Sequence, residues 1–522
     1  MSEFFALALF AVTCLLIIIG YPVAFTLAGS ALLFAAIGSL LNIFEFSLLG
    51  AYSQQIFGRM TNPVLIAVPL FVFMGIMLER SKVAEEMLDT MGALFGRLRG
   101  GLGISVICVG ALLASSTGIV GATVVTMGLL SLPTMLRRGY EPSLAAGTIC
   151  AAGTLGQIIP PSIVLVLLGE VLSSAYQQSQ LQRGIFAPDT VSVGDLFAGS
   201  LVPGILLVAM YILYQLVAAW LHPASSPVII EQETQNTEGR LTVRVMAALG
   251  PPALLIFAVL GSILGGIAQP TEAAAVGCVG AGLLAALKVD PGARRWVLSA
   301  LFAMAVLIVL ATMLDLRIGR SVIPVEDAIG IGLAVLFSVV LLFGIVDAFR
   351  RIHHVGILCE VMEGTLRITS MVFVILIGAA LFALVFRGFG GDVLIHSFLT
   401  GLPGGAVGAM LFVMATLFLL GFFLDFIEIV YVVVPIVVPP LIAMGLDPLW
   451  IGVMIAVNLQ TSFLTPPFGF ALFYLRGVAP KSVTTAHIYK GVVPFIVIQV
   501  GALLILAAFP PLVLWLPKLI YG

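Results

Sequence analysis

The sequence predicts an all-α polytopic membrane protein, and three observations support that prediction. The 522-residue chain is 61% hydrophobic and only 9% charged, whereas a soluble domain carries about 25% charged residues. Uncharged runs long enough to cross a bilayer recur along the whole chain. The 55 glycines and 28 prolines fall partly inside these runs, so uninterrupted long helices do not account for them. Charges this sparse cannot cover the surface of a water-soluble protein.

Membrane-spanning helices need about 20 apolar residues, at about 1.5 Å of rise each. By this measure we expect about 12–14 membrane-embedded segments. The first uncharged run, 4–44, is long enough for two passes, broken at Gly20-Tyr21-Pro22. The other uncharged runs are 60–78, 100–136, 143–169, 196–230, 245–271, 296–314, 328–346, 368–386, 393–424, 429–446, 448–475 and 491–517. The polar stretches 176–195, 222–244 and 350–367 are expected to be loops or interfacial helices.

A repeat links the two halves of the chain at a single offset of 306 residues. The strings LPTMLRRGYEP and GTLGQIIPPS in the first half correspond to VPPLIAMGLDP and LQTSFLTPPF in the second. The offset aligns Pro133 with Pro439, Gly139 with Gly445, Pro142 with Pro448, and Pro160-Pro161 with Pro466-Pro467. Interrupted helices at corresponding positions of two halves are typical of secondary transporters and indicate their binding site.

Each repeat opens on an apolar stretch that is too long for one helix and too interrupted for two. The stretch 103–136 is interrupted at 115–118 and 121–123, and the stretch 408–444 is interrupted at Gly421. Two arms of about a dozen residues each cover only about 20 Å, which is shorter than the bilayer core. We therefore interpret each stretch as a re-entrant hairpin. Two ordinary spans joined by a tight turn are the alternative. A hairpin tip exposes backbone polar groups at membrane depth, which is tolerated only where they line a cavity or bind something.

Asp425 and Glu428 are the only charged residues between Asp392 and Asp447. They are three positions apart, so they share one face if the segment is helical. An acid at bilayer depth costs about 2.5–3.5 kcal/mol on insertion scales, so an intramembrane carboxylate indicates function by default. The alternative is that these acids lie at an interface or satisfy a neighbouring helix terminus.

The segment behind each hairpin is rich in proline, glycine and hydroxyl side chains. A proline removes a backbone donor and breaks a helix, which frees carbonyls upstream. Side-chain oxygens beside such carbonyls form a hard-oxygen environment that suits Na⁺. The residues concerned are Gly153, Thr154, Gly156 and Pro160 in the first repeat, and Asn458, Thr461, Ser462, Thr465, Pro466 and Gly469 in the second. A proline kink that only aids packing is the alternative for each.

Other classes of function find no support in the residues. The chain has no Walker A loop for ATP hydrolysis and no HExxH or GxSxG motif for hydrolysis, so no enzyme is expected. The five cysteines show no CxxC or Cys/His spacing, so neither a zinc site nor another resident cofactor is expected. A net charge of −2 offers no basic face for nucleic acid.

In its motifs the chain resembles the large membrane (permease) subunit of tripartite ATP-independent periplasmic (TRAP) transporters, the DctM-like subunit. The matching strings occur in family order and span about 62 to 516: GLGISVICVGALLASSTGIVGATVV, LPTMLRRGYEPSLAAGTICAAGTLGQIIPPSI, PTEAAAVG, GFFLD and GLDPLWIGVMIAVNLQTSFLTPPFG. The chain departs from the family in extra sequence at 176–195 and about 290–352, the second holding two apolar segments. These additions resemble a longer subgroup associated with organic and keto acids.

The resemblance implies an elevator-type, Na⁺-coupled importer in the bacterial or archaeal cytoplasmic (inner) membrane. A mobile domain made from two inverted hairpin repeats would carry substrate past a fixed scaffold. By motif position, one sodium and substrate region would hold Ser115, Ser116, Thr117, Gly121, Thr123, Gly153, Thr154, Gly156 and Pro160. The other would hold Asp425, Asn458, Thr461, Ser462, Thr465, Pro466 and Gly469. A small four-helix membrane subunit (DctQ-like) and a periplasmic substrate-binding protein would complete the system.

The implied organisation has scaffold helices over 1–100, a first transport repeat over 101–175, further scaffold helices over 176–405, a second transport repeat over 406–476 and a C-terminal helix over 477–522. We expect import of a small organic acid (a dicarboxylate, keto acid or similar carboxylate), because the positive ends of broken helices suit a carboxylate. The alternatives are a proton-coupled carrier or ion-transporting subunit that uses Asp425 and Glu428, or a membrane scaffold without transport. A scaffold would not need two proline-broken tips at equivalent positions.

Overall fold

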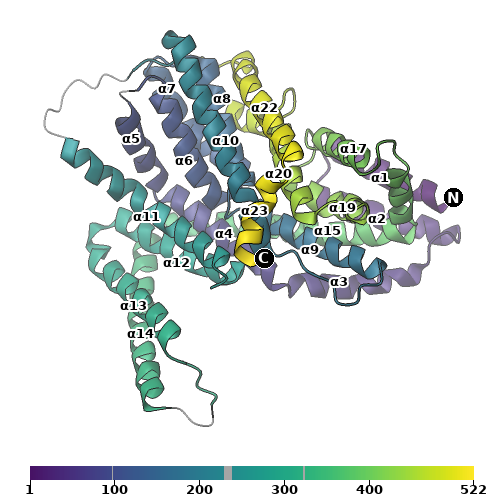
Figure 1. Cartoon of the computed structure of the whole chain (residues 1–522), viewed down its shortest axis with the longest axis horizontal. Helices are drawn as coiled ribbons and strands as arrows, with labels where there is room; N and C mark the ends of the chain where they lie inside the picture. Colours follow the sequence, from purple (N-terminus) through teal and green to yellow (C-terminus); the bar gives the residue numbers. More distant parts are fainter. Residues whose placement is uncertain (97, 229–237, 321–323) are drawn as a thin grey trace.

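The computed structural model describes residues 1–96, 98–228, 238–320 and 324–522, with side chains for all of these except 116, 117, 182 and 238–242. Every regular element in these ranges is a helix, which confirms the all-α prediction (Figure 1). Eleven of the described helices are long and apolar enough to cross a membrane, and the bent pair Phe426–Val432 and Val434–Ala443 adds a twelfth. The prediction of a polytopic membrane protein is therefore confirmed.

Loops and the two proline doublets separate the helices from one another. In the first half they are α1 (Ser2–Ile19), α2 (Val23–Leu40), α3 (Ala51–Met60), α4 (Pro63–Arg80), α5 (Val83–Phe95), α6 (Gly101–Thr117), α7 (Val120–Arg137), α8 (Pro142–Thr154), α9 (Ile163–Gln182), α10 (Val193–Leu221) and α11 (Glu238–Leu264). In the second half they are α12 (Pro270–Val289), α13 (Arg294–Met313), α14 (Val325–His354), α15 (Ile357–Gly388), α16 (Gly391–Thr400), α17 (Gly405–Leu420), α18 (Phe426–Val432), α19 (Val434–Ala443), α20 (Pro448–Leu464), α21 (Phe470–Val478), α22 (Thr485–Ala508) and α23 (Pro511–Tyr521).

The first hairpin consists of α6 and α7, which are joined at Gly118 and Ile119. Gly118 ends α6 in the left-handed conformation, with a φ of 60°, which glycine adopts without steric cost. The arms have 17 and 18 residues, so each covers about 25–27 Å at 1.5 Å per residue. The prediction of arms of about a dozen residues is therefore wrong, because the helix continues through the polar residues 115–117.

The second hairpin runs from α17 through a turn at 421–425 into α18 and α19. The two short helices of its return arm are bent by 55° relative to each other. Pro435 lies in the first turn of α19 and has no backbone N–H, so the hydrogen-bond ladder cannot continue through this point. The return arm of the second hairpin is therefore itself broken, unlike α7 of the first.

Behind each hairpin one helix stops at a proline doublet and another begins. Both α8 and α20 start on a proline, at positions 306 residues apart. The first passes through a 3₁₀ turn at 155–157 before Pro160-Pro161, and the second stops at Leu464 before Pro466-Pro467. Both doublets contain a cis peptide bond. Residues 156–162 are named the first break and residues 462–468 the second break.

The two hairpins are inverted relative to each other, as contacts along α22 show. Near the start of α22, Lys490 forms an ion pair of 3.3 Å with Glu141, which follows the base of the first hairpin. Near its end, the carbonyl of Leu506 accepts a hydrogen bond of 3.0 Å from the indole of Trp450, which follows the base of the second hairpin. These contacts are 16 residues apart along one helix, or about 24 Å. The predicted inverted repeat is therefore confirmed.

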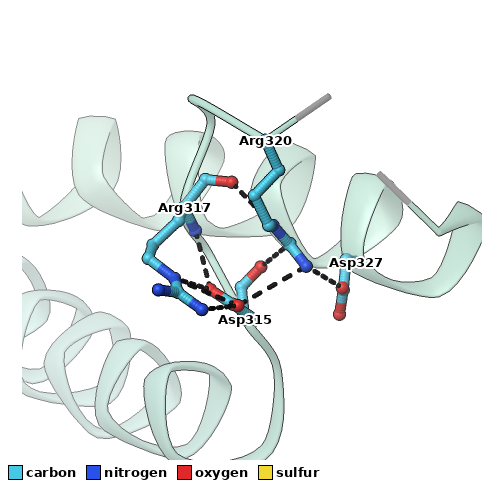
Figure 2. A network of polar contacts seen from close by, with 4 residues as sticks. All are labelled: Asp315, Arg317, Arg320 and Asp327. Atoms are coloured by element: carbon cyan, nitrogen blue, oxygen red, sulfur yellow. Dashed lines mark hydrogen bonds and ion pairs between the residues drawn. The ribbon is translucent and has the colours of Figure 1, made fainter. Parts of the chain in front are cut away.

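The two apolar segments predicted near 290–352 form the antiparallel pair α13 and α14, which projects from the body of the protein (Figure 1). Figure 2 shows the charged network in the connection between these helices, where Asp315 accepts from Arg317 at 2.9 Å and Arg320 donates to Asp327 at 3.0 Å. The side chain and backbone N–H of Arg317 hold the pKa of Asp315 well below its usual range. This network lies far along the chain from both hairpins.

Candidate sodium and substrate site

The first tip, residues 114–121, lies in close contact with the first break and the start of α9 at two glycines. A Cβ atom on Gly156 would lie 2.9 Å from the carbonyl oxygen of Ala114. A Cβ atom on Gly118 would lie 2.8 Å from the backbone nitrogen of Ile163, the first residue of α9. A side chain at either glycine would therefore separate the tip from the break. The predicted association of Gly156 with the first tip is present in the structure.

Two hydroxyl groups of the first hairpin, those of Ser115 and Thr123, are buried and donate to carbonyls of their own helices. Ser115 is 1% exposed, and its Oγ donates to the carbonyl three residues earlier at 2.7 Å. Thr123 is 2% exposed, and its Oγ1 donates to the carbonyl four residues earlier at 3.1 Å. The Ser115 hydroxyl can also accept through its oxygen while it donates its proton. The side chains of Ser116 and Thr117 lie outside the described residues.

Tyr474 on α21 covers the first hairpin where α7 begins. A Cβ atom on Gly121 would lie 2.7 Å from the Tyr474 ring, so the ring packs directly on this glycine. On the other side of the hairpin, a Cβ atom on Gly153 would lie 2.3 Å from the Val124 side chain. Both predicted site glycines are therefore points of close approach. Tyr474 lies on α21, which follows the second break, so its ring joins this segment to the first hairpin.

The second tip, residues 420–427, meets the second break where a Cβ atom on Gly421 would lie 2.5 Å from Ser462 Oγ. Ser462 donates from Oγ to the carbonyl of Phe418 at 2.7 Å, and Asn458 donates from Nδ2 to the carbonyl of Met414 at 2.8 Å. Asn458 and Ser462 both lie on α20, and both accepting carbonyls lie near the end of α17. These bonds tie the outgoing arm of the second hairpin to the helix that carries the break.

Asp425 and Glu428 form a capping box at the start of α18. The Asp425 side chain accepts from the backbone N–H of Phe426 at 2.7 Å, and Glu428 Oε2 accepts from the N–H of Asp425 at 3.0 Å. The structure therefore shows the alternative given above, in which both acids satisfy a helix terminus, here the start of α18. Each carboxylate oxygen can accept more than one bond, so the cap leaves acceptor capacity on Asp425. Glu428 also lines a small cavity against α1 and α2, on the side away from α20.

Thr461 and Thr465, beside the second break, donate to carbonyls of their own segment, as Ser115 and Thr123 do. Thr461 donates to the carbonyl of Val457 at 2.8 Å, and Thr465 donates to the carbonyl of Thr461 at 2.7 Å. The carbonyl of Thr465 accepts from the N–H of Gly469 at 3.1 Å. The carbonyl of Gly156 likewise accepts, from Ser162 Oγ at 2.7 Å. The carbonyls of Gly156 and Thr465 thus each accept a hydrogen bond, and a carbonyl oxygen has two lone pairs.

The two repeats meet at equivalent residues. Gln460 donates from Nε2 to Thr154 Oγ1 at 3.4 Å, and these positions are 306 residues apart. Beside them, Gln499 on α22 donates to the hydroxyl of Tyr211 on α10 at 2.7 Å, and all four side chains are fully buried. The sequence analysis did not predict Gln460, Gln499 or Tyr211. The signal for each was a single polar residue inside a long apolar run.

The arrangement brings two tips, two breaks and one carboxylate into a single packed region. The first tip lies on the first break, the second tip on the second break, and Tyr474 on α21, which follows the second break, packs on the first hairpin. The available ligands are hydroxyl and carbonyl oxygens with one half-buried carboxylate, Asp425. Such a set of oxygens around unwound helix ends can coordinate a monovalent cation such as Na⁺.

Comparison with known proteins gives a family match over nearly the whole chain. The family described as "Tripartite ATP-independent periplasmic transporter, DctM component" matches residues 10–315 and 327–512. Both hairpins, both breaks and most of the α13–α14 pair fall inside these ranges.

Curated relatives match over almost their full length. A C4-dicarboxylate TRAP transporter large permease protein from Vibrio cholerae is 28% identical, over 97% of this chain and 96% of the relative. An ectoine/5-hydroxyectoine TRAP large permease from Ruegeria pomeroyi is 26% identical, over 99% of this chain and 100% of the relative. A sialic acid TRAP large permease from Vibrio cholerae is 25% identical, over 97% of each chain.

Among solved structures, the chain is similar to the YdaH transporter of Alcanivorax borkumensis, whose structure is described as having an unusual topology. The TM-score is 0.53 with 14% identity, and the match covers 90% of this chain and 87% of that one. The similarity concerns the fold, and it is consistent with the elevator-type architecture expected from the sequence.

Proposed function

This chain belongs to the DctM component family of tripartite ATP-independent periplasmic transporters, and from that premise we propose that it is the Na⁺-coupled permease subunit of an organic-acid importer. It is a multi-pass protein of the inner membrane. In the proposed mechanism the two hairpins and the helices behind them form the moving transport domain. The helices α1–α4, α11, α12 and α15 form the fixed scaffold.

The observation that carries the sodium proposal is the pairing of each tip with its own break. Helix breaks at membrane depth release carbonyl oxygens and hydroxyls that a bilayer tolerates only in a protein-lined site. Two such sites, related by an inverted repeat, match the way secondary transporters build coupling-ion sites. Asp425 supplies the one negative charge, so the second site is proposed as the stronger cation site.

The proposed substrate is a small organic acid, such as a dicarboxylate or keto acid. Support comes from the relatives, whose names specify C4-dicarboxylates, sialic acid and ectoines. It also comes from the two breaks, since each is followed by a helix start, that of α9 or α21, and a helix start favours an anion. A carboxylate placed there would be stabilised without a lysine or arginine side chain.

The proposed partners are a small four-helix membrane subunit and a periplasmic substrate-binding protein, as the family description of a tripartite system supports. The distribution of charge supports an orientation in the membrane. The base of the first hairpin carries Arg99, Arg137, Arg138 and Lys490, whereas the base of the second is flanked by Arg183 and Asp447. By the positive-inside rule the first hairpin opens to the cytoplasm and the second to the periplasm.

A proton-coupled carrier is the second candidate, because Asp425 and Glu428 lie in contact through the capping box. The two candidates differ in the gradient that drives uptake. The test is uptake into proteoliposomes that contain the chain with its small subunit, supplied with loaded binding protein. Imposed Na⁺ and pH gradients are compared in separate vesicles. We expect uptake to follow the Na⁺ gradient, and uptake driven by a pH gradient alone would establish the proton-coupled candidate instead.

A further inference from the structure

A cavity of about 190 Å³ lies between the base of the second hairpin and the helices beside it. Its walls come from α19 (Pro435, Ile436, Pro439, Pro440), α15 (Ala383, Phe386), α9 and α16. A water molecule needs roughly 10–15 Å³ of such volume, so the cavity has room for a small organic acid and several waters. It is separate from both tip–break contacts, because none of the tip or break residues lines it.

Four polar side chains face this cavity: Gln178, Arg387, Asp392 and His396. Arg387 lies in the last turn of α15, where its Nη2 donates to Gln178 Oε1 at 3.2 Å. Asp392 lies in the first turn of α16, where one of its oxygens accepts from the backbone N–H of Val393 at 2.9 Å. Polar groups from the proposed scaffold and from the proposed transport domain therefore converge on one space.

The guanidinium of Arg387 has no carboxylate partner. Within the described residues it makes no ion pair, although Asp392 lines the same cavity. Asp392 and His396 are the other titratable side chains on the cavity wall. An arginine with one hydrogen bond retains four N–H donors in a planar fork suited to a carboxylate. An arginine without an acidic partner on the wall of a cavity can therefore bind an anion.

The cavity lies at the base of the second hairpin, on the side of the protein opposite the basic residues at the base of the first hairpin. Arg183, which follows α9, donates to the carbonyls of Ile442 and Ala443 at 2.8 and 2.7 Å, so the end of α9 and the end of α19 meet here. In the orientation proposed above, this is the periplasmic side. Substrate released by a periplasmic binding protein would reach this end of the transport domain first.

We propose that the cavity between α9, α15, α16 and α19 is an entry site for the organic acid, in which Arg387 binds the carboxylate before it reaches the tips. The inference rests on the proposed function for the direction of transport, but the anion preference of the cavity does not. Asp392 opposes the incoming charge and Arg387 attracts it, so the two side chains have effects of opposite sign.

The test measures the local preference for anions with cysteine reagents, without substrate or sodium. Val393 lines the cavity and is 66% exposed, so Val393→Cys is introduced into the full chain with the exposed Cys359 replaced by serine. Labelling rates are compared for a methanethiosulfonate that carries a sulfonate and one that carries a trimethylammonium group. Phe186→Cys, in the loop after α9, serves as the reference outside the cavity.

We expect the sulfonate-to-ammonium rate ratio at Val393→Cys to exceed the reference ratio by about threefold, because a unit charge about 7 Å away in a water-like dielectric changes the ratio about sevenfold and Asp392 offsets part of the effect of Arg387. Arg387→Gln should reduce the ratio below the reference value, because Asp392 remains, and Asp392→Asn should raise it further. A ratio that neither substitution changes would overturn the proposal, and so would a shift of both in one direction.

A phospholipid headgroup is the other source of an anion at this depth. Labelling is therefore repeated in vesicles of phosphatidylcholine alone and of phosphatidylcholine with phosphatidylglycerol. We expect the ratio to be the same in both. If phosphatidylglycerol slows sulfonate labelling at Val393→Cys but not at Phe186→Cys, a lipid phosphate occupies the cavity and the entry site is contradicted. Both outcomes are independent of whether uptake proves to be sodium-driven.

Discussion

The two tip–break pairs share a backbone plan but are closed by different chemistry. In the first pair, Gly156 and Gly118 bring backbone into contact with backbone. In the second, the position equivalent to Gly156 is Ser462, whose hydroxyl bonds to α17 at 2.7 Å. The position equivalent to Ile119 is Asp425, which caps α18. Both pairs therefore contain a glycine at the point of closest approach, Gly156 in the first and Gly421 in the second, and the second pair adds the Ser462 hydrogen bond.

This difference separates what the duplicated fold supplies from what each copy adds. Both copies place helix ends and carbonyls at membrane depth, because both carry the proline doublet. Only the second copy adds a carboxylate, so the two sites are not equivalent electrostatically. We expect cation affinity to depend mainly on the second pair, and tight closure to depend mainly on the first.

The largest effect is expected at Asp425. Asp425→Asn keeps the size of the side chain and an oxygen for the cap but removes the charge that would attract Na⁺. Unit charges about 4 Å apart interact by about 4 kcal/mol at the effective dielectric of a protein surface. We expect sodium-driven uptake in proteoliposomes to fall roughly a hundredfold. Glu428→Gln should be milder, because Glu428 points towards α1 and α2. Equal losses in the two variants would show that the capping box, not the charge, is what matters.

The next effect is expected at Gly121. Leucine there would collide with the Tyr474 ring, since even a Cβ atom would lie 2.7 Å away. Overpacking of this kind costs about 1–3 kcal/mol, so we expect at least roughly tenfold slower uptake at normal expression. The matched control is Ile427→Leu, at the equivalent position of the second repeat, which should transport normally. If Gly121→Leu is tolerated as well as the control, Tyr474 does not constrain the first hairpin.

A smaller effect is expected at Ser462. Ser462→Ala removes the hydrogen bond to the carbonyl of Phe418, a loss of about 1 kcal/mol. We expect the Na⁺ concentration for half-maximal uptake to rise about fivefold, with little change in the maximal rate. The reciprocal variant, Gly156→Ser, should instead lower the maximal rate, because its Cβ displaces the first tip. If both variants change the same kinetic parameter, the proposed difference between the two tip–break pairs is contradicted.

The smallest effect is expected at Asp315, in the connection between α13 and α14. Since its pKa is lowered in the folded protein, its contribution to stability is present above the ordinary carboxyl pKa. That contribution is lost as the pH falls through the lowered value. Between pH 6 and pH 8 this network should therefore not titrate. We expect Asp315→Asn to change uptake less than about twofold, since exposed ion pairs contribute little. A larger change would connect the α13–α14 pair to transport.

The architecture was predictable from sequence because prolines and glycines recur at one offset and mark helix ends directly. The arm lengths of the first hairpin were not, because residues 115–117 are polar yet remain helical until Gly118. The contribution of Tyr474 was hidden for a different reason. A tyrosine in an apolar helix has no periodic signal, and its contact with Gly121 joins residues more than 350 positions apart. Gln460 was visible in the string LQTSFL, but its partner Thr154 became apparent only once the two repeats were packed together.

The most direct test of the account is equilibrium binding of ²²Na⁺ to the purified full-length chain, compared between wild type and Asp425→Asn. The account predicts saturable binding that unlabelled Na⁺ displaces and K⁺ does not. It also predicts that Asp425→Asn weakens this binding strongly, while Ile427→Leu leaves it unchanged. Saturable binding that is identical in wild type and Asp425→Asn, or the absence of saturable binding in wild type, would contradict the proposal that the second tip and break form a sodium site.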